Sequence, residues 1–255
     1  MSEHALAIEI ARCPLVTQAV TDAAHPCHDI VSVQRGPETQ RQVPEGWAGA
    51  LATARVLFVS SNPSISEPVP GEGPESVEAY PVAADSDDTI GEFITRRFDA
   101  AVRPHPFVLN NKHLRRDGTY APHTTKFWSA INARAKELLG QSAHANVNYA
   151  MTEVVHCKSK SQIGVPKAAA TCAGRYLDPI LRVSAAAVVV VVGKEAHQQL
   201  APMLDLPDPV YVVPRQLGGT ERLVVYLPHP NAFTAKTFHG VYSAEDVARL
   251  REACL

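Results

Sequence analysis

The sequence predicts an α/β fold: a three-layer α/β/α sandwich with a mainly parallel, four-stranded central sheet. Four apolar runs have the length of strands and little alternation, which is typical of strands buried on both faces. They are residues 55–60, 148–155, 185–192 and 222–227. Helical patterns separate these runs, and strands that alternate with helices usually pair in parallel through right-handed crossovers.

Each predicted helix has recognisable ends. The helix at 126–139 closes at Gly140, and the helix at 166–183 has Pro166 at its first position. A third helix, at 194–204, directly follows Gly193. The last, at 243–253, begins with Ser243 as its cap.

Two segments do not follow this alternation. Residues 1–49 are mixed in character, and residues 65–125 are rich in proline, glycine and acidic residues around 68–88. The second segment is too long for an ordinary connection, so it is either an elaborated active-site loop or a partly mobile insertion. With 255 residues, 45% of them hydrophobic, the chain 1–255 is expected to fold as a single domain.

Composition limits the class of function. A net charge of -2 and a pI near 6.6 argue against a protein that coats nucleic acid through bulk electrostatics. Residues 1–14 do not resemble a secretory signal, and the longest apolar run, 185–192, has only strand length. We therefore expect a cytoplasmic protein with no membrane partner.

Two polar motifs follow the first and last predicted strands. Ligands bind at the carboxyl ends of the strands in an open parallel sheet. Residues 60–64 read Ser-Ser-Asn-Pro-Ser, and residues 229–231 read His-Pro-Asn. An amide held by a following proline can orient a water, and a fixed histidine can stabilise charge on a leaving group. Taken alone, each motif also fits a simple turn that ends a strand.

Together these motifs resemble the uracil-DNA glycosylase superfamily. Residues 60–64 are similar to the Gly-x-Asn-Pro-Gly motif of its mismatch-specific branch, with serines at both glycine positions. Residues 229–231 are similar to its His-Pro-Ser or His-Pro-Ala motif. The resemblance implies that Asn62 and His229 are catalytic, that Ser61 lies in the base pocket, and that Asn231 contacts phosphate or the neighbouring base pair.

Two further stretches resemble the same superfamily. Residues 125–128, Thr-Lys-Phe-Trp, are similar to the Asn-Arg-Phe-Trp start of a helix in the mismatch-specific branch. Phe127 is then either a platform for an extruded base or a core residue, and Trp128 belongs to the core. Residues 151–158 resemble the Thr-Asn-Val-Val-Lys-Cys segment of the iron-sulfur branch, but Glu153 stands where that branch has the asparagine that reads uracil.

Glu153 raises a question of base specificity. An amide can donate to one atom of the base and accept from the next, whereas an ionised carboxylate only accepts. Two interpretations stay open. Either burial keeps Glu153 protonated so that it mimics the amide, or the pocket prefers a base with two donors on that edge.

The chain has five cysteines, which in a cytoplasmic protein are more often ligands or inert thiols than disulfides. Cys157 and Cys172 resemble the second half of the four-cysteine site in the iron-sulfur branch, and Cys13 and Cys27 take the place of its usual Cys-x-x-Cys. The resemblance implies a structural 4Fe-4S iron-sulfur cluster on these four residues, with zinc or unpaired buried thiols as alternatives. Cys254 has no partner in this scheme.

The function implied by the resemblance is excision of a deaminated or mismatched base by a monofunctional DNA glycosylase, which leaves an abasic site for base excision repair. The partner would be single- or double-stranded DNA bound by a monomer, with Lys158 and Lys160 facing the DNA backbone. The main alternative is a non-catalytic nucleic-acid-binding or sensor protein with the same fold and cluster. An enzyme acting on a small molecule is a weaker alternative, since phosphate loops and nucleophile elbows are absent from the strand ends.

Overall fold

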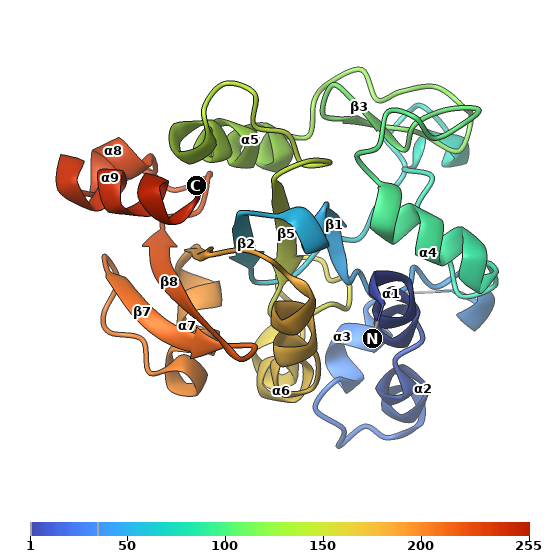
Figure 1. The fold of residues 1–255 in the computed structure, drawn as a ribbon. Coiled ribbons are helices and arrows are strands. Elements are labelled where there is room, and N and C mark those ends of the chain that lie inside the picture. The colour runs from blue at the N-terminus through green and yellow to red at the C-terminus, as the bar shows by residue number, and fades with distance from the viewer. Residues whose placement is uncertain (1, 35) are drawn as a thin grey trace.

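A computed structural model describes residues 2–34 and 36–255 of the chain. Within these residues the main sheet has six strands in the order β1-β5-β2-β6-β8-β7 (Figure 1). The central four pair in parallel and correspond to the four predicted strands. They are β5 (Tyr149–Glu153), β2 (Val56–Ser60), β6 (Val188–Val192) and β8 (Thr220–Leu227). The α/β class and the mostly parallel sheet are therefore confirmed.

The predicted count of four strands is wrong, because an antiparallel strand is added at each edge. β1 (Trp47–Gly49) pairs with β5, and β7 (Val212–Leu217) pairs with β8. β1 is only three residues long. β7 contains Pro214, which an edge strand tolerates because one side of it makes no ladder. Neither strand has the apolar run of a central strand, so neither was predicted.

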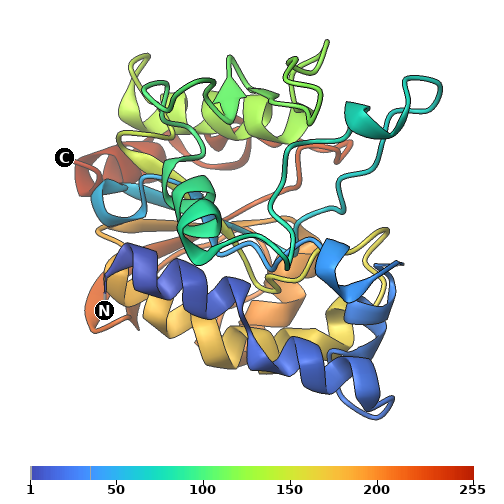
Figure 2. The ribbon, with the colours of Figure 1, turned by 90° about the vertical axis from the view of Figure 1, so that its right-hand side faces the viewer.

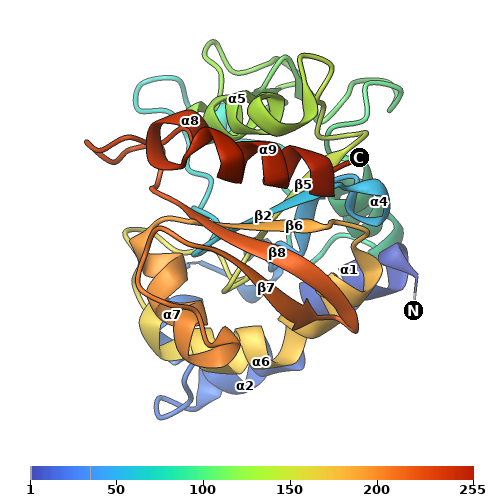
Figure 3. The ribbon, with the colours of Figure 1, turned by 60° about the vertical axis from the view of Figure 1, so that its left-hand side comes forward.

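Two helical layers enclose the sheet. α1 (Glu3–Ala11), α6 (Val165–Val183) and α7 (Lys194–Leu204) cover one face, and α5 (Lys126–Leu139), α8 (Phe238–Val241) and α9 (Ala244–Ala253) cover the other (Figure 3). Successive strand residues point to opposite faces. On β2, Leu57 and Val59 thus join the first core, while Val56 and Phe58 join the second. The chain has the three-layer arrangement that its sequence predicts.

The helix ends also agree with the sequence. α5 and α7 have the predicted bounds, and α6 begins one residue earlier than predicted, at Val165. Gly140 closes α5 with a φ of 83°, a left-handed value that favours glycine. Ser243 caps α9, since its Oγ accepts the Asp246 backbone N–H at 3.1 Å.

The two irregular segments contain structure of their own. The first holds α2 (Pro14–Thr21), α3 (His28–Ser32) and the 3₁₀ turn η1 (Glu38–Gln40), and the turn η2 (Leu51–Thr53) follows β1. The long segment 65–125 holds the turn η3 (Pro74–Ser76), α4 (Asp87–Arg96) and a small hairpin of β3 (Val108–Leu109) and β4 (Lys112–His113). Figures 1 and 2 show α4 beside α1 and next to β1, so this insertion packs against the sheet.

In the described part of the chain, no helix combines the length and the apolar character needed to cross a membrane.

Arg222 joins the end of α6 to the β7–β8 hairpin. Its buried guanidinium donates to the carbonyls of Leu181 at 2.7 Å and Ser184 at 2.8 Å, and also to that of Ala186. Its Nε donates to the Leu217 carbonyl at 3.1 Å. The last carbonyls of a helix have no partner within the helix, so Arg222 satisfies groups that burial would otherwise leave unpaired.

Replacing this side chain tests its structural role. Arg222→Met keeps an apolar stem but leaves buried carbonyls without a donor, and we expect the free energy of unfolding to fall by about 3 kcal/mol or more. Urea denaturation measures the change. Arg249→Met, on the exposed face of α9, is the matched control and should change the free energy of unfolding by less than about 0.5 kcal/mol. Equal effects of the two substitutions would contradict the role given to Arg222.

Candidate active site

A cavity of about 550 Å³ lies at the carboxyl ends of the parallel strands, as expected for an open α/β sheet. Most of the site residues suggested by the sequence line this cavity: Ser61, Asn62, Phe127, Glu153, Lys158, His229 and Asn231. Lys160 does not line it. Lys160 is exposed and pairs with Glu67 at 3.0 Å. The cavity therefore gathers residues that lie far apart in the chain, such as Ser61 and Asn231.

Asn62, two residues beyond the end of β2, presents an acceptor to this cavity. Its Nδ2 donates to the Pro63 carbonyl at 2.8 Å. This bond fixes the orientation of the amide group, since only its nitrogen can donate. The opposite atom, Oδ1, is buried and has no hydrogen-bond partner among the described residues. A buried acceptor without a partner is unfavourable unless a ligand or water supplies the hydrogen.

His229, two residues beyond the end of β8, presents a donor. The Asn231 backbone N–H points at Nδ1 from 3.2 Å, so Nδ1 is the acceptor and a neutral ring carries its proton on Nε2. Burial lowers the pKa of His229, which favours this neutral form. The Phe127 ring stacks on the imidazole with centroids 5.8 Å apart. Gly193 allows the close packing, because a Cβ there would lie 3.2 Å from the His229 Cβ.

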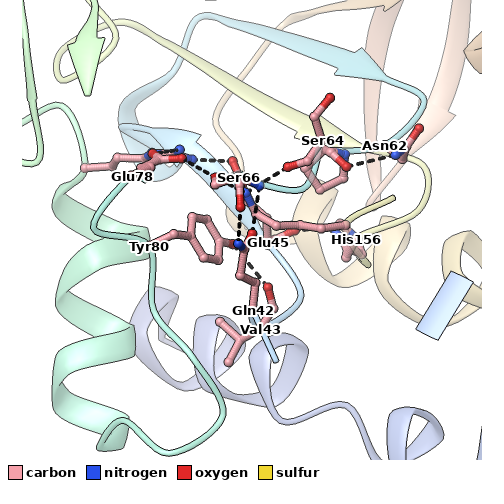
Figure 4. Close-up of polar contacts among 12 residues, drawn as sticks. Gln42, Val43, Glu45, Asn62, Ser64, Ser66, Glu78, Tyr80 and His156 are labelled. Carbon is pink, nitrogen blue, oxygen red and sulfur yellow. Dashed lines mark hydrogen bonds and ion pairs between the residues drawn. The ribbon is translucent and has the colours of Figure 1, made fainter. Parts of the chain in front are cut away.

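The cavity wall also holds a buried charge cluster of Glu45, Glu78, Arg97, Glu153 and Lys158. Arg97 donates to Glu45 at 2.5 Å and also to Glu78. Lys158 donates to the Ser64 carbonyl at 3.0 Å, and its Nζ lies 3.8 Å from Glu45 Oε2. Figure 4 shows Glu45, Glu78 and Ser66 converging between the Asn62 loop and α4. The insertion 65–125 thus contributes to the cavity wall.

Aromatic rings surround the cations of the cluster. The Arg97 guanidinium lies 4.8 Å from the centroid of the buried Trp128 ring, and the Lys158 ammonium lies 3.6 Å from that of Tyr80. Ring faces attract desolvated cations and partly replace their lost hydration. Lys158, expected to face a DNA backbone, is instead buried in the wall, because Glu45, Ser64 and Tyr80 all attract its ammonium group.

The carboxyl groups of the cluster differ in their protonation. Burial opposes ionisation of Glu78, but the charges of Arg97 and Lys158 and a hydrogen bond from Ser66 outweigh it and lower its pKa to about 2. Burial raises the pKa of Glu153 well above its ordinary value, and the nearby Glu45 raises it further. The Oε2 atom of Glu153 is buried and has no hydrogen-bond partner in the described chain.

Gln162 holds the loop beside the cavity, a role that the sequence did not suggest. The Ser61 hydroxyl donates to Gln162 Oε1 at 2.9 Å, and Gln199 Nε2 lies 3.3 Å from the same hydroxyl. Ser161 and Gln162 have φ values of 53° and 63°, in the left-handed region that few residues other than glycine adopt. Such backbone persists only where surrounding contacts hold it, and the Ser61 bond is one of them.

The four cysteines singled out by the sequence lie on the α6 side of the sheet. Cys27 and Cys172 belong to the core there, and Cys13 and Cys157 pack against it. Burial and the neighbouring thiols raise the pKa of Cys172 to about 12 and that of Cys27 to about 11. The His156 backbone N–H donates to Cys172 Sγ at 3.4 Å. Within residues 2–34 and 36–255, no group of three or more His, Cys, Asp or Glu side chains has the arrangement of a metal-ion site.

His156 links these thiols to the buried charge cluster. Its Nδ1 lies 2.7 Å from the Glu45 carbonyl, and its own carbonyl accepts the Glu45 backbone N–H at 2.8 Å. Burial lowers the pKa of His156 to about 4, so the ring is neutral and Nδ1 carries the proton that the Glu45 carbonyl accepts. The ring and the backbone carbonyl of His156 therefore both hold the backbone of Glu45, in the segment before β1.

No known protein-family profile matches the chain, and a search of curated proteins also finds no match.

The ion pairs of Arg97 lead to a prediction about the stability of the folded protein. Arg97→Met removes the charge that compensates Glu45 and Glu78, and we expect the free energy of unfolding at pH 7 to fall by about 3–5 kcal/mol. Arg96→Met is the matched control, since Arg96 is more exposed and pairs only at the surface. Its loss should be about 1 kcal/mol or less.

Acid should reduce the effect of Arg97→Met. The folded pKa of Glu78 is about 2, below its ordinary value of 4.5, so its ionised form stabilises the fold above pH 4.5 and that contribution is lost as the pH falls toward 2. A protonated Glu78 has no charge for Arg97 to compensate. Chemical denaturation at several pH values should show the two proteins converging between pH 4.5 and 2, and a constant difference would contradict the pairing.

Proposed function

We propose that the chain is a DNA glycosylase of the uracil-DNA glycosylase superfamily, which hydrolyses the N-glycosidic bond of a base flipped into the cavity. The observation that carries the proposal is the meeting of the Asn62 acceptor and the His229 donor in one cavity, from strands that are separated by β6. A reaction on a nucleotide inside a duplex requires extrusion of the base into such a pocket.

Asn62 orients the attacking water. Its Oδ1 accepts a hydrogen from the water and directs the water oxygen at the anomeric carbon of the sugar. The C1′–O bond forms as the C1′–N bond breaks, and the base departs with the electron pair of that bond. The proton released by the water passes to solvent or to the departing base. An amide acts here by position alone, because it does not need to take the proton itself.

His229 stabilises the departing base. Negative charge develops on the base as the glycosidic bond breaks, and a fixed donor near a base carbonyl lowers the energy of that state. The neutral imidazole offers its Nε2 proton for this bond, since the Asn231 backbone N–H occupies Nδ1. Phe127 supports the ring by stacking on it, and it also packs against the core on the α5 side of the sheet.

Phe233 supports a role in opening DNA. It lies four residues after His229 and is fully exposed, an unusual position for a large apolar side chain. Proteins that distort a duplex insert apolar side chains between its bases. In the proposed complex, Phe233 would fill the space that a flipped base leaves, and Asn231 nearby is also exposed.

Four cysteine thiols on one side of the sheet support the proposal of a structural iron-sulfur cluster. Thiolates are the ligands that such clusters use, and the thiols of Cys13, Cys27, Cys157 and Cys172 lie near enough to raise one another's pKa. In the proposed enzyme, Cys13, Cys27, Cys157 and Cys172 would each hold the cluster through a thiolate. When bound, the cluster would tie the N-terminal helices to α6 and to the loop after β5.

Asn62→Ala tests the catalytic assignment. We expect base release to fall by at least about 100-fold while DNA binding is retained, because the water loses its orientation but the cavity keeps its other contacts. Alkali cleavage of oligonucleotides carrying uracil, hypoxanthine, xanthine or a mismatched thymine measures the reaction. Gln141→Ala, exposed between α5 and β5, is the control and should leave base release unchanged. Retained turnover in Asn62→Ala would exclude Asn62, and cleavage of no substrate by the wild-type protein would favour the non-catalytic binding protein.

Cysteine substitutions test the cluster. Protein purified without oxygen should be brown and absorb visible light, and Cys172→Ser should lose that absorption together with its bound iron. Cys254→Ser is the matched control, because Cys254 is equally buried but packs on the α9 side of the sheet. Zinc is colourless, so a colourless protein that contains zinc would replace the cluster with the zinc alternative.

A further inference from the structure

Glu153 places a carboxyl group where the cavity meets its charged wall. It is the last residue of β5 and is 7% exposed, and it lines the cavity. Ser60, at the end of the neighbouring β2, is its register partner in the sheet. The buried Oε2 of Glu153 has no hydrogen-bond partner among the described residues. An ionised carboxylate with a buried, unpaired oxygen is strongly unfavourable, whereas a neutral carboxyl leaves a donor free for a ligand.

The charges around Glu153 are already balanced without it. Glu45, which precedes β1, and Glu78, from the insertion, oppose Arg97, which follows α4, and Lys158, which follows β5. Tyr80 is a further titratable group near Glu153, and burial and the nearby carboxylates raise its pKa so that it stays neutral. His113 also lines the cavity, and burial lowers its pKa, which favours its neutral form. Two carboxylates thus face two cations, and an ionised Glu153 would be a third negative charge with no cation of its own.

We infer that Glu153 is held as a neutral carboxylic acid whose O–H, at Oε2, donates to a carbonyl oxygen of the flipped base, so that the cavity selects bases with a carbonyl beside a ring N–H. The inference rests on the proposed glycosylase function and deepens it by naming the substrate class. Burial and the charge of Glu45 support it, because both raise the pKa of Glu153 more than Arg97 and Lys158 lower it.

A neutral carboxyl group has the hydrogen-bonding pattern of an amide. One oxygen donates and the other accepts, so the pair matches a base carbonyl next to a ring N–H, as in uracil, hypoxanthine and xanthine. The ionised form offers acceptors only and would repel that carbonyl. This favours the first of the two interpretations that the sequence leaves open for Glu153. It also makes recognition depend on pH, which an asparagine in the same position would not.

The pH dependence of base release tests the inference. Wild-type kcat/KM for uracil-containing DNA should fall as the pH rises through the raised pKa of Glu153, because the donor is then lost. Glu153→Gln keeps a donor and an acceptor at every pH, so it should retain activity within about tenfold and lose the alkaline fall. Glu153→Ala should lose about 100-fold or more. Glu67→Gln, at an exposed carboxyl, is the control and should keep the wild-type profile.

A second variant tests the inference independently, in case the Glu153→Gln protein does not fold. Glu45→Gln removes the nearest negative charge and should move the alkaline fall to lower pH. An unchanged profile in a folded Glu45→Gln or Glu153→Gln protein would overturn the inference.

Two measurements separate this inference from the proposed function. The infrared carbonyl band of a neutral carboxyl group, present in wild type and absent in Glu153→Gln at pH 7, reports the protonation of Glu153 whether or not the protein is an enzyme. Binding of free uracil and hypoxanthine, compared with adenine and 2-aminopurine, which have no carbonyl, is followed by NMR and reports base selection without turnover. An ionised Glu153, or equal binding of all four bases, overturns the inference and leaves the glycosylase proposal standing. A neutral Glu153 that selects uracil and hypoxanthine, in a protein that releases no base, supports the inference and removes the glycosylase proposal.

Discussion

The buried guanidinium of Arg97 is the interaction on which the cavity depends. It joins Glu45, from the segment before β1, to Glu78, from the insertion, and it lies over the Trp128 ring at the start of α5. Burying ions carries a large desolvation penalty that only close partners offset. The three segments that contact Arg97 must therefore pack together cooperatively. The cluster thereby makes the insertion a part of the site. It also restricts the sequence, since a single added or removed charge in this wall leaves another charge uncompensated.

The sequence predicts the centre of this fold better than its edges. Central strands such as β6, with five consecutive valines, are recognisable because burial on both faces requires apolar residues at every position. β1 and β7 lack that pattern, since edge strands satisfy fewer constraints. Asn62 and His229 were predictable because each closely follows a central strand. Glu45 and Arg97 were not, because a buried charge looks like a surface charge until its partner is known, and Lys158 was expected at the surface for the same reason.

The two sides of the cavity use different electrostatics. Asn62 and His229 are both neutral, and each is oriented by a neighbouring backbone group, the Pro63 carbonyl and the Asn231 N–H. The ions are concentrated in the cluster around Arg97. Neutral groups held by backbone keep their orientation as the pH changes, whereas the charged wall responds to protonation through Glu153. In the proposed enzyme, the chemistry would be insensitive to pH over a range in which base selection is not.

The edge strands have a consequence for the behaviour of the whole protein at high concentration. An open sheet edge is a template onto which another chain can add a strand, and apolar segments such as Val188–Val192 are the ones that amyloid-like assembly uses. β1 offers only three residues, and β7 contains Pro214 and the positively charged Arg215. Both edges are poor templates. The five valines thus lie between strands that resist self-association, and the chain keeps a very apolar centre without exposing it to its own copies.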